Sequence, residues 1–342
     1  MPIVQISFRR EERRYNRPHM RNLTAAIRPD QLSDVLGSVR FQGVIFCRSE
    51  LSAPWGFSVL GREFASFHLV TRGRCCLDVD GLTERIWLAE GDLVILPTGN
   101  AHTVRDAPSS PATRLEELIA GTGVDASGTL RSGGGGATTV LVCGGFHFED
   151  PAANPLLASL PPIIHLRGRS RAADRWLDLT LALLSDEAES DRPGAAMTMI
   201  RLADLLFIEA VRTYFSAPGT SKHGLAAALR DPRIATAIAS MHRQPEAKWD
   251  LRRMAKQAAM SRAAFADRFK ALVGESPIVY LTRCRMNKAS GLLSSSHVPL
   301  SQVAARSGYD SEASFGRAFK RATGKSPAAY RKKRLASAAR PG

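Results

Sequence analysis

Arginines, acidic residues and very small residues surround two pairs of phenylalanines in the last hundred positions. Phe265 and Phe269 lie four residues apart, and the pair recurs fifty positions later as Phe315 and Phe319. Residues four apart share one face of a helix, so most of the residues between them lie on the other. Arg can donate two hydrogen bonds to a guanine edge, Asp or Glu can accept from cytosine, and Ala or Gly permits close approach. The chemistry that this pattern indicates is recognition of base edges in DNA.

The candidate DNA-contacting residues are those left over once the four phenylalanines are assigned to buried helix faces. They are Arg262, Ala263, Ala266, Asp267, Arg268, Lys270, Ser311, Glu312, Ala313, Gly316, Arg317 and Lys320. Arg268 and Lys270 are expected nearer the phosphate backbone. For any single position, a solvent-exposed role without base contact is the alternative.

The positive charge of the chain is concentrated in the same stretch. Residues 231–342 contain 22 Lys and Arg against 7 Asp and Glu, whereas the whole chain has 47 against 32. Residues 1–230 therefore carry 25 of each sign and no net charge. Such asymmetry is typical of a nucleic-acid-binding segment. A basic face that serves only solubility is the simpler alternative.

Each copy of the pattern is predicted to be a helix-turn-helix unit. Ser261 can cap the second helix of the first unit, and Asp310 or Ser311 that of the second. The second turn is one residue longer, and Gly308 suits a turn position with positive φ. A connecting helix over 277–294 would be about 27 Å long. That length can hold two recognition helices about 34 Å apart, one turn of DNA.

Residues 41–148 alternate strand-like runs with turn residues, which predicts an all-β domain. The run from Gly91 through Pro97 and Gly99 to His102 matches the second sequence motif of the cupin fold, a small β-barrel. Phe67 and Leu69 stand where the first motif of a metal-binding cupin has His. An effector pocket without a metal is therefore expected at Phe67, His68, Leu69, His102 and Cys143.

The chain resembles the AraC/XylS family of bacterial transcription regulators from Asp231 to about Lys333, most specifically over Ala304–Arg331. The resemblance implies that both units bind adjacent major-groove segments of double-stranded DNA, usually to activate transcription with RNA polymerase. A weaker resemblance to the cupin-type sensors of such regulators covers about 32–217. The expected fold class is therefore multidomain, with an N-terminal all-β cupin-like barrel with flanking helices and a C-terminal all-α double helix-turn-helix.

Five segments are expected along the chain. They are a basic tail (1–27), the sensor barrel (28–170), amphipathic helices and a linker (171–224), the DNA-binding domain (225–335) and a short tail (336–342). Apolar residues at helical spacing fill 172–189 and 195–215, where a homodimer contact is one expectation. No run of 18 apolar residues or signal peptide is visible, and five cysteines lack metal-type spacing. These features predict a protein of the reducing cytoplasm without membrane contact.

Several alternatives remain open at this point. One is a cupin-type metalloenzyme with a DNA-binding appendage, and another is a DNA binder that needs no effector. A metal site of His68, His102 and His147 and a thiol sensor using Cys75 or Cys143 are minor hypotheses. The main expectation is a regulator with no catalytic residue, metal or cofactor, and with a small-molecule effector as a further partner.

Overall fold

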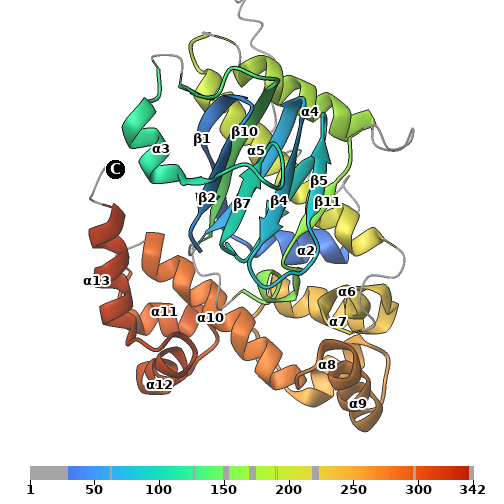
Figure 1. Ribbon diagram of the computed structural model, residues 1–342. Coiled ribbons are helices and arrows are strands. Elements are labelled where there is room, and N and C mark those ends of the chain that lie inside the picture. Colours follow the sequence, from blue (N-terminus) through green and yellow to red (C-terminus); the bar gives the residue numbers. More distant parts are fainter. Residues whose placement is uncertain are drawn as a thin grey trace, which may run out of the picture.

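The computed structural model describes the chain from residue 30 to residue 338 with short gaps (Figure 1). The described ranges are 30–61, 64–125, 128–148, 154–168, 175–188, 190, 192–217, 223–295 and 298–338. The predicted basic tail (1–27) lies outside them, as do the last four residues of the predicted C-terminal tail.

Two β-sheets that face each other form the N-terminal part. In pairing order, the described strands of the first sheet are β11 (Ile164–Leu166), β6 (Leu93–Leu96), β3 (Ala65–Arg72), β10 (Thr138–Phe148), β1 (Phe41–Ser52) and β9 (Thr129–Gly133). Those of the second are β5 (Ile86–Ala89), β4 (Arg74–Val79), β7 (His102–Arg105), β2 (Gly56–Val59) and β8 (Thr113–Arg114). The cupin-like, sheet-rich prediction is confirmed, although the described strands form two sheets and not one closed ring.

Strand β3 is buried on both of its faces. Val70 packs between the two sheets, whereas Phe67 and Leu69 pack on the outer side of the first sheet. There the Phe67 ring lies 5.2 Å from that of Phe146, which lies 5.0 Å from Phe207. Because successive strand residues point to opposite faces, His68 shares the inner face with Val70.

Helices cover the outer face of the first sheet (Figure 1). Helix α4 (Arg175–Ala188) and helix α5 (Ala195–Ser216) confirm the two predicted amphipathic runs. The shorter helices of this part are α2 (Gln31–Gly37), α3 (Leu115–Thr122) and the 3-10 helix η2 (Leu157–Ser159). Among the described residues, no helix is both long and apolar enough to cross a bilayer.

The C-terminal part is helical and contains both predicted helix-turn-helix units. Its helices are α6 (Leu225–Arg230), α7 (Pro232–Arg243), α8 (Leu251–Gln257), α9 (Arg262–Val273), α10 (Pro277–Ser295), α11 (Leu300–Arg306), α12 (Glu312–Thr323) and α13 (Pro327–Ala338). Residues 258–261 separate the helices of the first unit and residues 307–311 those of the second. The one-residue difference in turn length is therefore confirmed.

The apolar core is divided unequally between the two units. One cluster of buried side chains runs from the outer side of the first sheet through α5 and α2 into α7, α8 and α9. The second unit has a separate cluster that includes Phe315, Phe319 and Tyr330. The first unit thus shares a core with the N-terminal part, whereas the second has its own.

Candidate nucleic-acid interface

Local hydrogen bonds set where each second helix begins. Ser261 accepts a hydrogen bond from the backbone N–H of Ala264 at 3.3 Å, and Ser311 accepts one from that of Ser314 at 3.2 Å. These side chains satisfy backbone donors that a helix start leaves free. Of the two predicted caps of the second unit, Ser311 is the one observed.

The paired phenylalanines anchor these helices to the rest of each unit. All four rings are fully buried. Phe269 lies 5.5 Å from Tyr280, and Phe319 lies 5.3 Å from Tyr330, with edge-on geometry in both cases. The repeated Tyr at the start of the next helix thus explains why the sequence pattern extends beyond the units themselves.

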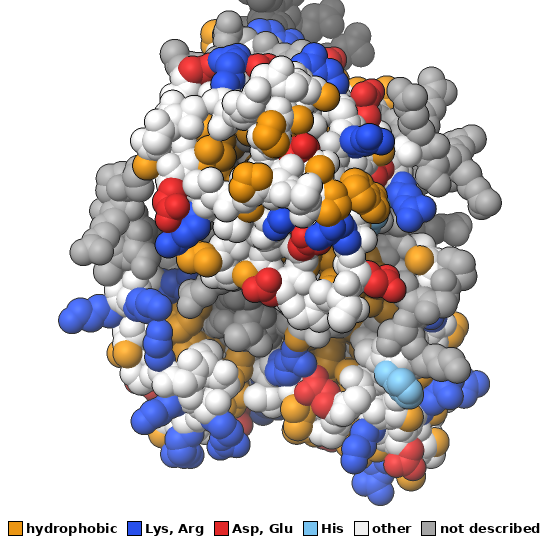
Figure 2. Space-filling view, viewed as in Figure 1, with side chains coloured by type: hydrophobic (Ala, Val, Ile, Leu, Met, Phe, Trp, Pro, Cys, Tyr) orange, Lys and Arg blue, Asp and Glu red, His pale blue; other side chains and the backbone are white. Residues whose placement is uncertain are grey.

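The predicted contact residues remain accessible on the opposite helix faces. Ala266 and Gly316 are half-buried, and the other ten are exposed. Lys and Arg side chains gather on the two lower lobes in Figure 2, where Figure 1 places α8–α9 and α11–α13. Both second helices, called recognition helices below, therefore belong to one basic end of the molecule.

The arginines of this surface differ in whether they already form an ion pair within the protein. Arg268 forms an ion pair with Asp231 at 2.9 Å, and Asp231 also caps α7 by accepting hydrogen bonds from Arg233 and Ile234. Within the described part of the chain, Arg262 and Arg317 have no such side-chain partner. In particular, Arg317 makes no ion pair with Asp310 or Glu312 there. The structure thus ties Arg268 to its own fold and leaves Arg262 and Arg317 available to a ligand.

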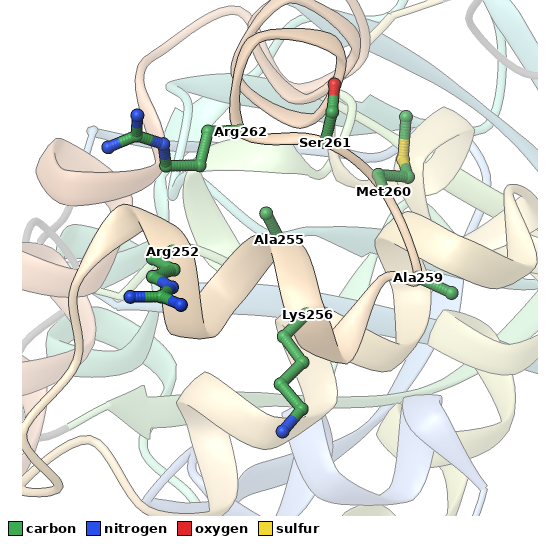
Figure 3. Close-up of a pocket in the computed structure, with 7 residues that line it drawn as sticks. All are labelled: Arg252, Ala255, Lys256, Ala259, Met260, Ser261 and Arg262. Atoms are coloured by element: carbon green, nitrogen blue, oxygen red, sulfur yellow. The ribbon is translucent and has the colours of Figure 1, made fainter.

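A hollow of about 490 Å³ opens between α8 and the start of α9 (Figure 3). Its lining residues are Arg252, Ala255, Lys256, Ala259, Met260, Ser261 and Arg262. Arg252 and Arg262 extend to the same side, while Ala255 points from α8 toward the α9 start. The hollow thus combines an apolar floor with cations suited to phosphate.

Arg252 and Lys256 on α8 were missed by the sequence reasoning, which considered only the second helix of each unit. Both are exposed, whereas Met254 and Ala255 beside them are buried. The helical spacing of charged and apolar residues in this segment could have indicated which of them are exposed. The neighbouring Arg253 lies 4.5 Å over the Trp249 ring and donates to the Lys248 carbonyl, so charge alone does not identify an available side chain.

Arg285 of α10 connects the two units. Its guanidinium donates hydrogen bonds to the carbonyls of Pro245 and Ala247, at 2.8 and 3.0 Å, beside the first unit. It also lies 5.6 Å from the ring centre of Tyr309 in the second unit's turn. Gly308 faces the same group, because a Cβ there would lie 2.9 Å from Arg285 Nε. The orientation of the units therefore depends on one half-buried cation as well as on the connecting helix.

The five residues predicted to form the effector pocket lie on two sides of β3. His68, His102 and Cys143 meet between the sheets: His68 Nε2 is 2.8 Å from His102 Nε2, and His68 Nδ1 is 3.2 Å from Cys143 Sγ. Phe67 and Leu69 instead face the helices outside. The five residues therefore do not line one cavity.

Burial keeps the His68 and Cys143 side chains of this inner group uncharged. Burial, together with His102, lowers the pKa of His68 well below its usual value, and burial raises the pKa of Cys143 well above its own. Burial also raises the pKa of Cys75 to about 12. A thiol with a raised pKa is a poor nucleophile, so the geometry gives no support to Cys75 or Cys143 as a reactive thiol.

The inner group also does not resemble a metal centre. The two His68 nitrogens face different partners, so one ion cannot replace both contacts. The described residues contain no group of three or more His, Cys, Asp and Glu arranged to hold a metal. The cupin fold often carries a metal in its barrel, but the donor set here does not fit one.

A polar seam joins α2 of the N-terminal part to α7 and to α10. His242 lies with Nδ1 2.8 Å from Ser38 Oγ and Nε2 2.7 Å from Tyr280 Oη. Asn287 donates to the Ser38 carbonyl at 2.8 Å, and Arg243 forms an ion pair with Asp34. No sequence pattern indicates this seam, because the contacts of α2 and Ser38 within it join residues more than 200 positions apart.

Two helix-turn-helix units at one basic end, joined to a two-sheet domain, define a DNA-binding transcription regulator. Comparison with known families agrees: the family described as Cupin matches residues 30–216, and that described as Helix-turn-helix domain matches residues 254–333.

Whole-length relatives place the chain in one family. An AraC-like transcription regulator of Streptomyces lividans is 33% identical, covering 89% of this chain and 98% of its own. The regulator AlkR of Acinetobacter baylyi is 31% identical, covering 88% and 99%. Among solved structures, the DNA-binding domain of AdpA in complex with a target DNA is 34% identical over 31% of this chain and 96% of its own, with a TM-score of 0.30. The chain belongs to the AraC-like family of transcription regulators.

Proposed function

We propose that this regulator places α9 and α12 in adjacent major-groove segments of a promoter and activates transcription by contact with RNA polymerase. The observation that carries the proposal is the pair of matching helices whose exposed faces hold Arg262 and Arg317 at one basic end. Helix-turn-helix units present such faces to base edges. The proposal places the protein in the cytoplasm, where promoter DNA is, and assigns it no catalytic reaction.

The two-sheet domain is proposed to adjust DNA binding in response to a small molecule. Its support is the shared core with the first unit, since α2 packs directly on α7, which in turn packs on α8. The second unit, with its separate core, would follow through α10 and Arg285. The first unit is thus the proposed recipient of the signal.

Selection from random DNA with the full-length chain tests the DNA-binding part. We expect one enriched site with two preferred segments about one helical turn apart. If about six phosphates are contacted, the logarithm of the binding constant should fall with the logarithm of salt concentration with a slope of roughly −5. A near-flat salt dependence, or enrichment of no sequence, would contradict the proposal.

Activation is tested separately by transcription in vitro from a promoter that carries the selected site. We expect more transcript when the full-length chain is added to RNA polymerase. Less transcript would assign the opposite sign of regulation, while leaving the DNA contacts intact.

A further inference from the structure

The first helices of the two units differ in charge although they match in position. Helix α8 carries three cations where the corresponding positions of α11, 49 residues later, are uncharged. The α8 residues are Arg252, Arg253 and Lys256, and their α11 counterparts are Ser301, Gln302 and Ala305. Helix α11 has one cation, Arg306, at the position of Gln257. The first helix of the first unit therefore attracts anions more strongly than that of the second.

Two of the three α8 cations are available to a partner. Arg252 and Lys256 are both exposed and lie one helical turn apart. Within the described part of the chain, neither side chain forms a hydrogen bond or an ion pair. Arg253 differs, because an aromatic ring and a backbone carbonyl already hold its guanidinium. The adjacent acid, Asp250, is engaged as the helix cap, since it accepts from the Arg253 backbone N–H at 2.6 Å.

Both available cations line the hollow between α8 and the start of α9. Figure 3 shows that Arg252 reaches to the same side as Arg262 of α9. The Cβ atoms of residues four apart on a helix lie about 5–6 Å from each other, so Arg252 and Lys256 can contact one phosphate or two neighbours on a strand. Every polar side chain of the lining is exposed. The hollow therefore suits the surface of a duplex better than a small enclosed anion.

The hollow adjoins the recognition helix of the first unit. In a helix-turn-helix, the second helix enters the major groove and the first crosses the backbone beside it. With α9 in the groove, Arg252 and Lys256 therefore face the strand that borders it. On α9 itself, Ala263 and Ala266 offer no hydrogen bond to a base. The first unit thus combines a strongly basic first helix with few base-reading side chains.

We propose that Arg252 and Lys256 bind backbone phosphates beside α9, so that the first unit holds DNA largely by sequence-independent contacts. The inference rests on the proposed function and divides the work between the units: the first anchors the duplex, and the second reads it through Arg317. Ser301 and Ala305 cannot form ion pairs with phosphate, so the second unit lacks this anchor.

The test measures binding of the full-length chain to two fluorescent duplexes over a range of salt concentrations. One duplex carries the selected site, and the other is a scrambled sequence of the same composition. Each phosphate contact contributes about 0.9 to the salt slope. The variant Arg252→Ala with Lys256→Ala should therefore have a slope about 1.8 less steep than the parent, and should bind both duplexes more weakly by the same factor. Ala is the best helix former, so these exposed changes keep α8 folded.

Two control variants accompany this measurement. Arg253→Ala removes a cation from the same helix, but one that the protein already holds, so the slope of the parent should persist. Arg252→Lys with Lys256→Arg keeps both charges and should also keep the slope.

A slope like the parent's in the double alanine variant would overturn the inference, as would a loss of affinity confined to the selected site, which indicates base contacts. Intact DNA binding with reduced transcription would also overturn it, because the two cations would then serve an acidic surface of RNA polymerase. A parent chain that binds both duplexes equally would contradict the proposed function instead, while the change in slope could still be measured on the scrambled duplex.

Discussion

The recognition helices carry opposite charges at matching positions. At a spacing of fifty, Arg262 corresponds to Glu312 and Asp267 corresponds to Arg317. The residue before Arg317 is Gly316, whose added Cβ would meet nothing within 4 Å. Because Gly316 has no side chain, the surface of α12 is recessed beside Arg317. That side of the helix can therefore approach a base pair closely. These differences predict unequal contributions from the two units.

Arg317→Ala is expected to weaken operator binding by about 1–3 kcal/mol and to relax the preference at one base position, because a bidentate contact with guanine is lost. Arg262→Ala should have a smaller and less base-dependent effect, because Ala263 and Ala266 beside it can contribute only apolar contact. Selection from random DNA followed by affinity measurements with the full-length variants gives both quantities. An unchanged base preference for Arg317→Ala would rule out dominance of the second unit.

At the scale of elements, both turns contain one residue in the left-handed backbone conformation, but the residue type differs between them. Ala259 of the first turn and Gly308 of the second, 49 positions apart, both have positive φ, 51° and 81°. A Cβ is unfavourable in this left-handed region. The first turn therefore carries strain that the second avoids.

Ala259→Gly is expected to raise the free energy of unfolding by about 1 kcal/mol, since the residue no longer opposes the left-handed conformation. Gly308→Ala should lower it by more, because the added Cβ would also meet Arg285. Urea denaturation of the full-length proteins measures both changes. Equal and negligible effects would show that neither turn is strained.

Helices α4 and α5 leave apolar side chains uncovered. Leu179 and Leu183 lie one turn apart on α4 and are each 55% exposed, and Met197 and Leu205 on α5 are also exposed. We predict that these residues form a homodimer contact. Leu183→Glu should then shift the sedimenting species from dimer to monomer, whereas Leu60→Glu, at a 52% exposed site just after β2, should not. A monomeric parent protein would contradict the prediction.

At the scale of the whole molecule, the seam at α2 makes folding of the N-terminal part and of the helices α7 and α10 interdependent. Burial lowers the pKa of His242 to about 4, although Asp34 opposes this shift. The unfolded chain takes up the proton at about pH 6.5. Since the unfolded state binds the proton first on acidification, stability is complete above about pH 6.5 and falls until about pH 4.

The loss assigned to His242 is up to about 3 kcal/mol of unfolding free energy. Urea denaturation from pH 7.5 to pH 4.5 should show a shallower decline for His242→Gln than for the parent chain. The comparison isolates His242, because the buried His68 titrates in both proteins. Identical slopes would mean that His242 keeps an ordinary pKa in the folded state.

The sequence by itself determined the two helix-turn-helix units, their turn lengths and the Ser261 cap, because each depends on contacts within a few dozen residues. Periodicity placed Phe265, Phe269 and their counterparts inside correctly, since one face of each short helix is buried and the other is exposed. The cupin-like strands were found for the same reason.

Only the tertiary structure decided which residues meet across long distances. All residues from Ala65 to Val70 are buried, so alternation could not show that His68 faces the second sheet while Phe67 and Leu69 face helices. The ion pair that occupies Arg268 and the His242 seam likewise depend on segments brought together by folding. Local pattern records whether a residue is buried, whereas packing alone determines what it is buried against.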